Sequence, residues 1–372
     1  MFDLATPEGT RRYTDRFSTS CAPGHFRTLP VQGGSNLLIS SIGMGSYTGP
    51  VTDEADAQYT AALVAAVRRG INLIDCAINY RHMRSERALG EGLRKLFESG
   101  EAARDELCVM SKGGYLPLDG RVPPNTGAYF RHTYLDTGII QRAELVANSH
   151  CIAPRFLEDQ IGRSLHNFGL QALDIYFLHN VEQQLDEVSQ EEFERRMEAA
   201  FAYLESAVES GRIGLYGVAT WNGFRVPPDA PGHLSLERLV EIAQKAGGEG
   251  HHFCALQLPY NLGMLEGLNM STQTLQGSLV PLLEAAAHFG LMVVTSVPLL
   301  QTQVLPHVPA EFARAMPNLT TQAQRALQFV RSTPGVFAPL VGMRNPSHVD
   351  ENAALCAVPP LGEAQFYRLL GG

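Results

Sequence analysis

Residues 70–90, GINLIDCAINYRHMRSERALG, hold the pattern that decides the fold. The apolar run at residues 71–75 predicts a short buried strand, which ends at the ionisable side chain of Asp75. A helical pattern follows at residues 85–97, after a loop that carries Tyr80. A strand that leads through a loop into a helix is the repeating unit of parallel α/β folds, so this stretch predicts one such unit with polar groups at its strand exit.

The same unit recurs along most of the chain. The predicted strand–helix pairs are residues 40–45 with 53–69, 71–75 with 85–97, 107–112 with 155–168, 173–179 with 191–209, 215–218 with 236–246, 253–258 with 277–289, 291–296 with 321–331, and 337–342 with a short helix after Pro346. Eight alternating units predict a parallel sheet that closes into a (β/α)8 TIM barrel, here a single domain over residues 1–372.

Three segments lie outside this alternation. Residues 1–25 are polar and predict an irregular N-terminal arm. Two β-like runs at residues 26–29 and 37–39, with a Gly-Gly turn signal at 33–34, predict a β-hairpin. Residues 113–154 form a long insertion rich in proline, glycine and aromatic residues, which we expect to be an ordered flap over the carboxyl-terminal face of the barrel.

A doubly wound dinucleotide-binding domain is the competing architecture. It requires a glycine-rich phosphate loop between its first strand and helix. Gly43 and Gly45 resemble the start of that motif, but no third glycine has the required spacing, and residues 50–56 place Pro, Asp and Glu where a pyrophosphate would bind. The sequence therefore favours the barrel.

The composition excludes several classes of function. With 29 basic and 38 acidic residues the net charge is −9, which opposes a broad nucleic-acid or anionic membrane surface. Six scattered cysteines without a CxxC pair predict reduced thiols. The N-terminal residues lack the apolar core of a signal peptide, and no stretch is long and apolar enough to span a membrane. We expect a cytoplasmic protein whose partner is a small molecule, and the oligomeric state stays open.

Histidines give no convincing metal site. His251 and His252 are adjacent and His233 is distant, but no carboxylate or thiol partner has ligand spacing. We therefore expect no metal.

The polar residues at the strand exits suggest an acid–base site. Asp75, Tyr80, Lys112 and His179 follow three predicted strands, and the carboxyl ends of barrel strands meet on one face. Taken singly, each has an ordinary structural explanation, such as a turn cap, a surface cation or a packed ring. Together, a phenol beside an ammonium and a carboxylate predicts a proton donor with a lowered pKa, which suits carbonyl reduction.

The chain resembles the aldo-keto reductase superfamily. Residues 70–90 match its Gly-x-Asn-x-x-Asp-x-Ala pattern, with a tyrosine five residues after the aspartate and Ser-Glu at the next helix. Supporting segments, in the family's order, are VMSKGG (109–114), LDIYFLHN (173–180), GRIGLYGVATWN (211–222), LQLPYNL (256–262) and VGMRNPSHVDENAA (341–354). Together they cover roughly residues 36–356.

The resemblance implies a carbonyl reductase with a nicotinamide cofactor across the barrel mouth. Tyr80 would be the acid/base, supported by Lys112, Asp75 and His179. The residues expected to hold the cofactor are Gly45, Ser46, Thr220, Gln257, Ser296, Leu299, Gln301, Arg344, Asn345, His348, Glu351 and Asn352. Those expected at the substrate are Tyr47, Tyr115 and Trp221, and closure of the flap would add Tyr129, Phe130 and Tyr134 as an apolar wall.

The choice of cofactor rests on one departure from the family. Where the family often places an arginine for the 2′-phosphate, this chain has His348, and Arg344 can replace it because a guanidinium binds phosphate bidentately. We therefore expect NADPH, with NADH possible. The alternative function is an NADPH-binding regulatory or cofactor-sensing barrel with little turnover.

Overall fold

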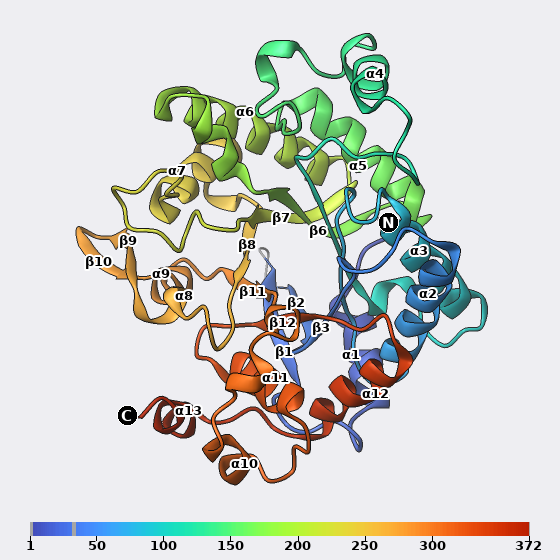
Figure 1. Cartoon of the computed structure of the whole chain (residues 1–372), viewed down its shortest axis with the longest axis vertical. Coiled ribbons are helices and arrows are strands. Elements are labelled where there is room, and N and C mark those ends of the chain that lie inside the picture. Colours follow the sequence, from blue (N-terminus) through green and yellow to red (C-terminus); the bar gives the residue numbers. More distant parts are fainter. Residues whose placement is uncertain (1–2, 32–34, 372) are drawn as a thin grey trace.

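Eight parallel strands close into a barrel, which confirms the predicted (β/α)8 architecture (Figure 1). The computed structural model describes residues 3–31 and 35–371. Around the barrel the strands are β3 (Gly43–Gly45), β4 (Leu73–Asp75), β5 (Cys108–Gly113), β6 (Leu173–His179), β7 (Ile213–Ala219), β8 (Phe253–Pro259), β11 (Met292–Ser296) and β12 (Ala338–Gly342). Each occupies the segment that the sequence predicts for it, within a few residues at either end.

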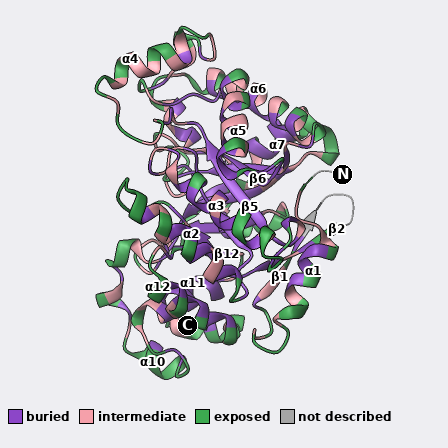
Figure 2. Ribbon diagram, turned by 90° about the vertical axis from the view of Figure 1, so that its right-hand side faces the viewer, coloured by how far each residue is buried: buried purple, intermediate pink, exposed green. Residues whose placement is uncertain are grey.

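The barrel is surrounded by helices whose apolar faces pack inward. They are α2 (Asp53–Val67), α3 (Arg84–Glu98), α5 (Pro154–Phe168), α6 (Gln190–Glu209), α7 (Leu236–Gly247), α9 (Leu282–His288), α11 (Gln322–Ser332) and α12 (Pro346–Ala353). In α3, for example, Leu89, Leu93 and Leu96 repeat at helical spacing and are fully buried. Figure 2 shows the result, with buried strands at the centre and exposed residues on the outer sides of the helices.

One predicted helix is wrong over its first part. Residues 277–289 were expected to be helical, but β9 (Ser271–Leu275) and β10 (Ser278–Pro281) form a hairpin before α9. Gln276 and Gly277, which join the two strands, both have positive φ, at 50° and 81°. Two such residues make the tight turn whose twist suits a hairpin, and this local preference outweighs the helical pattern.

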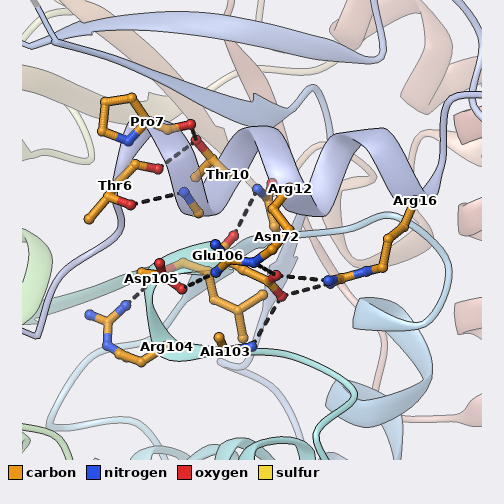
Figure 3. A network of polar contacts seen from close by, with 12 residues as sticks. Thr6, Pro7, Thr10, Arg12, Arg16, Asn72, Ala103, Arg104, Asp105 and Glu106 are labelled. Carbon is orange, nitrogen blue, oxygen red and sulfur yellow. Dashed lines mark hydrogen bonds and ion pairs between the residues drawn. The ribbon is translucent and has the colours of Figure 1, made fainter.

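The expectation of an irregular N-terminal arm is also wrong, because residues 7–16 form helix α1 (Pro7–Arg16). Thr6 caps this helix by accepting a hydrogen bond from the Gly9 N–H (2.9 Å). Arg12 and Arg16 then bind the buried carboxylate of Glu106 at 2.8 and 2.7 Å (Figure 3). Docking on the barrel therefore stabilises a helix that its polar sequence alone does not predict.

The predicted N-terminal hairpin is confirmed by β1 (Phe26–Val31) and β2 (Ser35–Ser40), which pair antiparallel. Its Gly33-Gly34 turn lies outside the described residues. Asn72 fixes the hairpin to the barrel: its Oδ1 accepts from the Ser40 N–H (2.8 Å) and its Nδ2 donates to the Leu38 carbonyl (2.9 Å). The hairpin covers the amino-terminal end of the barrel, so a site on the barrel axis must open at the carboxyl-terminal end.

The insertion at residues 113–154 is ordered and has a small core of its own. It contains the short helix α4 (Thr126–Phe130), which lies at the top of the view in Figure 1. Tyr134 is fully buried in this core, and Tyr129 and Phe130 pack against it. These three rings do not line the barrel mouth, so the apolar substrate wall predicted from them is wrong; packing within the insertion accounts for them.

Candidate active site

A cavity of about 930 Å³ opens among the carboxyl ends of the barrel strands. Its wall includes Asp75, Tyr80, Lys112 and His179, from three successive barrel strands and the loops after them. The size is that of a pocket for a cofactor or a small molecule. Parallel closure of the sheet thus brings together four side chains that span more than one hundred residues of sequence.

Lys112 and Asp75 form a buried ion pair in the floor of this cavity. The Lys112 Nζ donates to Asp75 Oδ1 (2.7 Å) and to the Cys76 carbonyl (2.6 Å). The two side chains are only 1% and 5% exposed. Burial raises the pKa of Asp75, while the charge of Lys112 and hydrogen bonds from Lys112 and Gln257 oppose that shift. The ammonium is therefore held in place by a partner that neutralises much of its charge.

Tyr80 lies beside this pair as a neutral phenol. The Lys112 Nζ is 4.8 Å from the centre of the Tyr80 ring. Burial raises the pKa of Tyr80 well above its usual value, and the negative charge of Asp75 raises it further. The predicted lowering of this pKa is wrong, because burial and the negative charge of Asp75 both disfavour the tyrosinate. No described residue forms a hydrogen bond with the Tyr80 hydroxyl, which leaves its proton free for a ligand.

His179 ends β6 near Tyr80, with the two ring centres 6.0 Å apart. Burial lowers the pKa of His179 well below its usual value, and the charge of Lys112 adds to this effect. The imidazole is therefore neutral, and its Nδ1 is buried with no partner among the described residues. Two uncharged groups with unused hydrogen-bonding capacity thus face the same space.

A chain of hydrogen bonds from the insertion fixes the end of β6. The buried His150 donates from Nε2 to the His179 carbonyl (2.6 Å), and its Nδ1 accepts from the Gln184 amide (2.8 Å). Arg196 donates to Gln184 Oε1 (2.7 Å), which orients that amide. Nothing in the spacing of these residues along the sequence predicts this network.

All but two of the residues expected to hold the cofactor line the cavity. Those that line it are Gly45, Ser46, Thr220, Gln257, Ser296, Leu299, Gln301, His348, Glu351 and Asn352. Arg344 and Asn345 lie outside the cavity wall. Arg344 packs against Gly49, and Asn345 caps α12 by accepting a hydrogen bond from the Ser347 N–H (3.1 Å).

Two features of the wall fit the dinucleotide that the sequence implies. The Gln257 Oε1 is buried without a partner among the described residues, as suits an acceptor for a carboxamide N–H. After β11, Val297, Leu300, Gln301 and Thr302 all have positive φ, between 44° and 73°. Strained backbone of this kind concentrates at ligand-binding loops.

The expected substrate residues also line the cavity. Tyr47 is 57% exposed and Trp221 is 43% exposed, so both offer apolar surface at the mouth. The Tyr115 hydroxyl accepts a hydrogen bond from the Asn180 amide (2.8 Å), which fixes this ring beside His179. The backbone at Trp221 is held by Glu182, which no sequence pattern singles out: its Oε1 accepts from the Trp221 N–H (2.7 Å).

The described residues contain no group of three or more histidine, cysteine or acidic side chains that is able to hold a metal ion. Within the same residues no helix is long and apolar enough to cross a membrane.

Fold and site together are those of a (β/α)8-barrel protein with its polar side chains gathered at the carboxyl ends of the strands. The profile of the aldo/keto reductase family matches residues 41–227, half of the chain, so the protein belongs to this family. A comparison with curated protein sequences gives no match.

Solved structures support the fold at low sequence identity. An aldo/keto reductase from Klebsiella pneumoniae in complex with NADP and acetate is 22% identical, with a TM-score of 0.59 over 90% of this chain and 92% of that chain. An aldo-keto reductase from the same organism in complex with NADPH is 20% identical, with a TM-score of 0.60 over 92% and 95%. A thermostable aldo-keto reductase in complex with the inhibitor epalrestat is 17% identical, with a TM-score of 0.60 over 92% and 98%.

Proposed function

We propose that the protein is an NADPH-dependent oxidoreductase that reduces an aldehyde or ketone to an alcohol. The observation that carries the proposal is a neutral Tyr80 beside a neutral His179 and the Lys112–Asp75 pair, all in the wall of one cavity. When bound, the reduced nicotinamide supplies the hydride that reaches the carbonyl carbon. The protein must then supply one proton to the carbonyl oxygen.

Tyr80 is the proton donor in this proposal. Its raised pKa keeps the phenol protonated at neutral pH, and the alkoxide that forms on hydride arrival is a much stronger base. The O–H bond of Tyr80 breaks as the alcohol O–H forms, which leaves a tyrosinate. Lys112 then stabilises that anion, Asp75 keeps Lys112 in place, and His179 orients the carbonyl through a hydrogen bond.

The cofactor assignment rests on the cavity wall and on the relatives. Gln257 and Thr220 would hold the carboxamide, Leu299 and Gln301 the pyrophosphate, and α12 the adenosine half. Structures of relatives with the same fold were solved with NADP and NADPH. Arg344, expected at the 2′-phosphate, lies outside this wall and against Gly49, so the preference for NADPH rests on these relatives.

The test combines binding with turnover. Trp221, the one tryptophan of the chain, lines the cavity, so quenching of its fluorescence by NADPH and NADH measures the affinity of each. Turnover on a panel of aldehydes follows, with Tyr80→Phe against the control Tyr47→Phe, which removes another hydroxyl from the same cavity. We expect Tyr80→Phe to lower kcat by roughly 10²- to 10⁴-fold with NADPH affinity unchanged, and Tyr47→Phe to retain activity.

A Tyr80→Phe protein that reduces aldehydes at the parental rate would remove the proton-donor assignment. Tight NADPH binding without Tyr80-dependent turnover would instead support the cofactor-sensing alternative.

A further inference from the structure

A strained turn follows Tyr80 directly. Arg81, His82 and Met83 have φ of 48°, 58° and 68°, three successive left-handed residues of which none is glycine. Each costs roughly 1–2 kcal/mol relative to ordinary backbone, because the Cβ approaches the carbonyl oxygen. Such a turn persists only when the surrounding structure holds it.

The side chain of Arg81 makes the contacts that stabilise this turn. Arg81 is 6% exposed although it carries a full charge. Its Nε donates to the Pro50 carbonyl (2.9 Å), and its Nη2 donates to the Thr52 carbonyl (3.3 Å) and to Asp56 Oδ1 (2.6 Å). The guanidinium carbon also lies 5.2 Å from the centre of the Tyr59 ring. Two carbonyls, a carboxylate and a ring therefore fix one guanidinium in one orientation.

These contacts join the two loops on either side of the catalytic phenol. The carbonyls that Arg81 binds belong to the loop after β3, and this loop begins beside Tyr47, whose ring centre is 5.0 Å from that of Tyr80. Tyr59 donates its hydroxyl to the Thr48 carbonyl (2.5 Å) and so braces the same loop from α2. Arg81 thus ties the backbone next to Tyr80 to the loop that follows Tyr47.

We propose that Arg81 is a positioning residue for Tyr80 in the proposed reduction. The Tyr80 hydroxyl has no hydrogen-bond partner among the described residues, so the ring is placed by its packing and by the turn that follows it. A displacement of about 1 Å in a reacting group can lower a rate by about 10²-fold. This inference rests on the proposed function, because it assigns Arg81 a role in the same proton transfer.

The test compares Arg81→Gly with His82→Gly. Both substitutions place glycine in the left-handed turn and relieve backbone strain, but only the first removes the guanidinium. His82 is a matched control, because the contact that it makes with Gly120 uses its backbone carbonyl (2.8 Å), which glycine retains. We expect Arg81→Gly to lower kcat for an aldehyde about 10- to 100-fold while the Kd for NADPH changes less than 3-fold, and His82→Gly to stay within 2-fold of the parent.

Arg81→Lys provides the conservative variant and a second measurement if Arg81→Gly folds poorly. An ammonium keeps the charge but cannot bind the two carbonyls and the carboxylate through one planar fork, so we expect an intermediate kcat. Equal kcat values for the parent, Arg81→Gly and Arg81→Lys would overturn the inference, as would equal losses in Arg81→Gly and His82→Gly. If Tyr80→Phe matches the parent, the proposed function fails first, so the two failures are distinguishable.

Discussion

The two ends of the barrel differ in which residues adopt left-handed backbone. At the amino-terminal end, every turn that leads from a helix into a barrel strand has a glycine with positive φ: Gly70, Gly100, Gly169, Gly211, Gly248, Gly290 and Gly335. At the carboxyl-terminal end, the described segments that follow the strands contain the non-glycine residues with positive φ: Arg81, His82, Met83, Ala147, Asn148, Asn180, Gln276, Val297, Leu300, Gln301 and Thr302.

This difference separates the turns that stabilise the fold from the loops that build the site. Glycine adopts left-handed backbone without a Cβ penalty, so the amino-terminal turns are unstrained. At the other end non-glycine residues occupy strained positions, and backbone strain of this kind clusters at active sites and ligand-binding loops. In barrels of this type function resides at the carboxyl ends of the strands.

Buried polar atoms without partners among the described residues occur at both ends, for example Arg104 Nε and His251 Nδ1 at the amino-terminal end, but those at the cavity belong to residues that line one open space. Near the start of β6, Asp174 accepts from the Ala5 and Val109 N–H groups (2.6 and 2.7 Å) and from Arg104 (2.8 Å). At the cavity, Asn79 Oδ1, His179 Nδ1 and Gln257 Oε1 are buried without partners among the described residues. Buried polar atoms without partners are costly in a folded protein, so we infer that the carboxyl-terminal end is built to bind a ligand.

The largest test of this comparison replaces the cation of one ion pair at each end. Lys112→Met leaves Asp75 unpaired at the site, and Arg104→Met leaves Asp174 unpaired at the amino-terminal end. Both should destabilise the fold by roughly 3–5 kcal/mol, because each leaves a buried charge uncompensated. Only Lys112→Met should also lower kcat for an aldehyde at least about 100-fold, since it removes the group that stabilises the tyrosinate.

Urea unfolding and steady-state kinetics on folded protein measure these two effects separately. A large loss of kcat in folded Arg104→Met would contradict the division of roles between the two ends.

The second test concerns charge at the substrate end of the cavity. Tyr47, Asn79, Tyr115, Asn180 and Trp221 are uncharged, and the cation beside them is already paired with an aspartate. A carboxylate there would lose hydration without gaining a partner. We expect kcat/KM for benzaldehyde to exceed that for 4-carboxybenzaldehyde by about 10- to 100-fold.

Trp221→Arg should lower the ratio of kcat/KM for benzaldehyde to kcat/KM for 4-carboxybenzaldehyde, because it adds a cation at the mouth. Trp221→Gln adds no charge and should leave this ratio unchanged. Equal kcat/KM values for the two aldehydes with the parent protein would show that the polar atoms of the site also accept anions.

Most of the fold follows from local sequence patterns. Apolar runs locate all eight barrel strands, and helical patterns that end at a glycine locate most of the helices. Two elements do not follow from such patterns. Helix α1 is polar and depends on ion pairs with Glu106. The hairpin at Gln276 depends on backbone angles that a helical pattern does not reveal.

The sequence predicts which residues form the site, but it does not predict the direction of the pKa shift of Tyr80. The positions of Asp75, Tyr80, Lys112 and His179 follow from strand exits and parallel closure. The shift in the pKa of Tyr80 depends on burial and on the nearby charge of Asp75, which only three-dimensional contacts decide. Arg81 was missed because an arginine in a loop ordinarily lies in solvent.

The third test asks whether buried histidines at the two ends respond alike to acid. Burial lowers the pKa of His150, at the carboxyl-terminal end, to about 4, and that of His25, at the amino-terminal end, to about 3. Both pKa values lie below the unfolded value near 6.5, so the unfolded chain binds more protons between these limits and stability falls as the pH drops through that window. At pH 5 each histidine should cost about 2 kcal/mol relative to pH 8.

Urea unfolding of the parent, His150→Gln and His25→Gln at both pH values isolates each contribution as a difference between proteins. The same pH dependence in all three would contradict the lowered pKa values. An effect of His150 alone would mean that the two ends also differ in how they tolerate acid.

The smallest test exchanges the backbone preferences of the two ends. Gly290 has φ of 66° and nothing within 4 Å of the position where a Cβ would lie, so Gly290→Ala adds strain without a clash. It should lower the free energy of unfolding by about 1 kcal/mol and leave kcat unchanged. His82→Gly makes the opposite change in the turn after Tyr80 and should raise stability by up to about 1 kcal/mol, since glycine accepts φ of 58° without strain. Urea unfolding measures both; if the two substitutions shift stability in the same direction, the strain assigned to the carboxyl-terminal loops is not stored in their backbone.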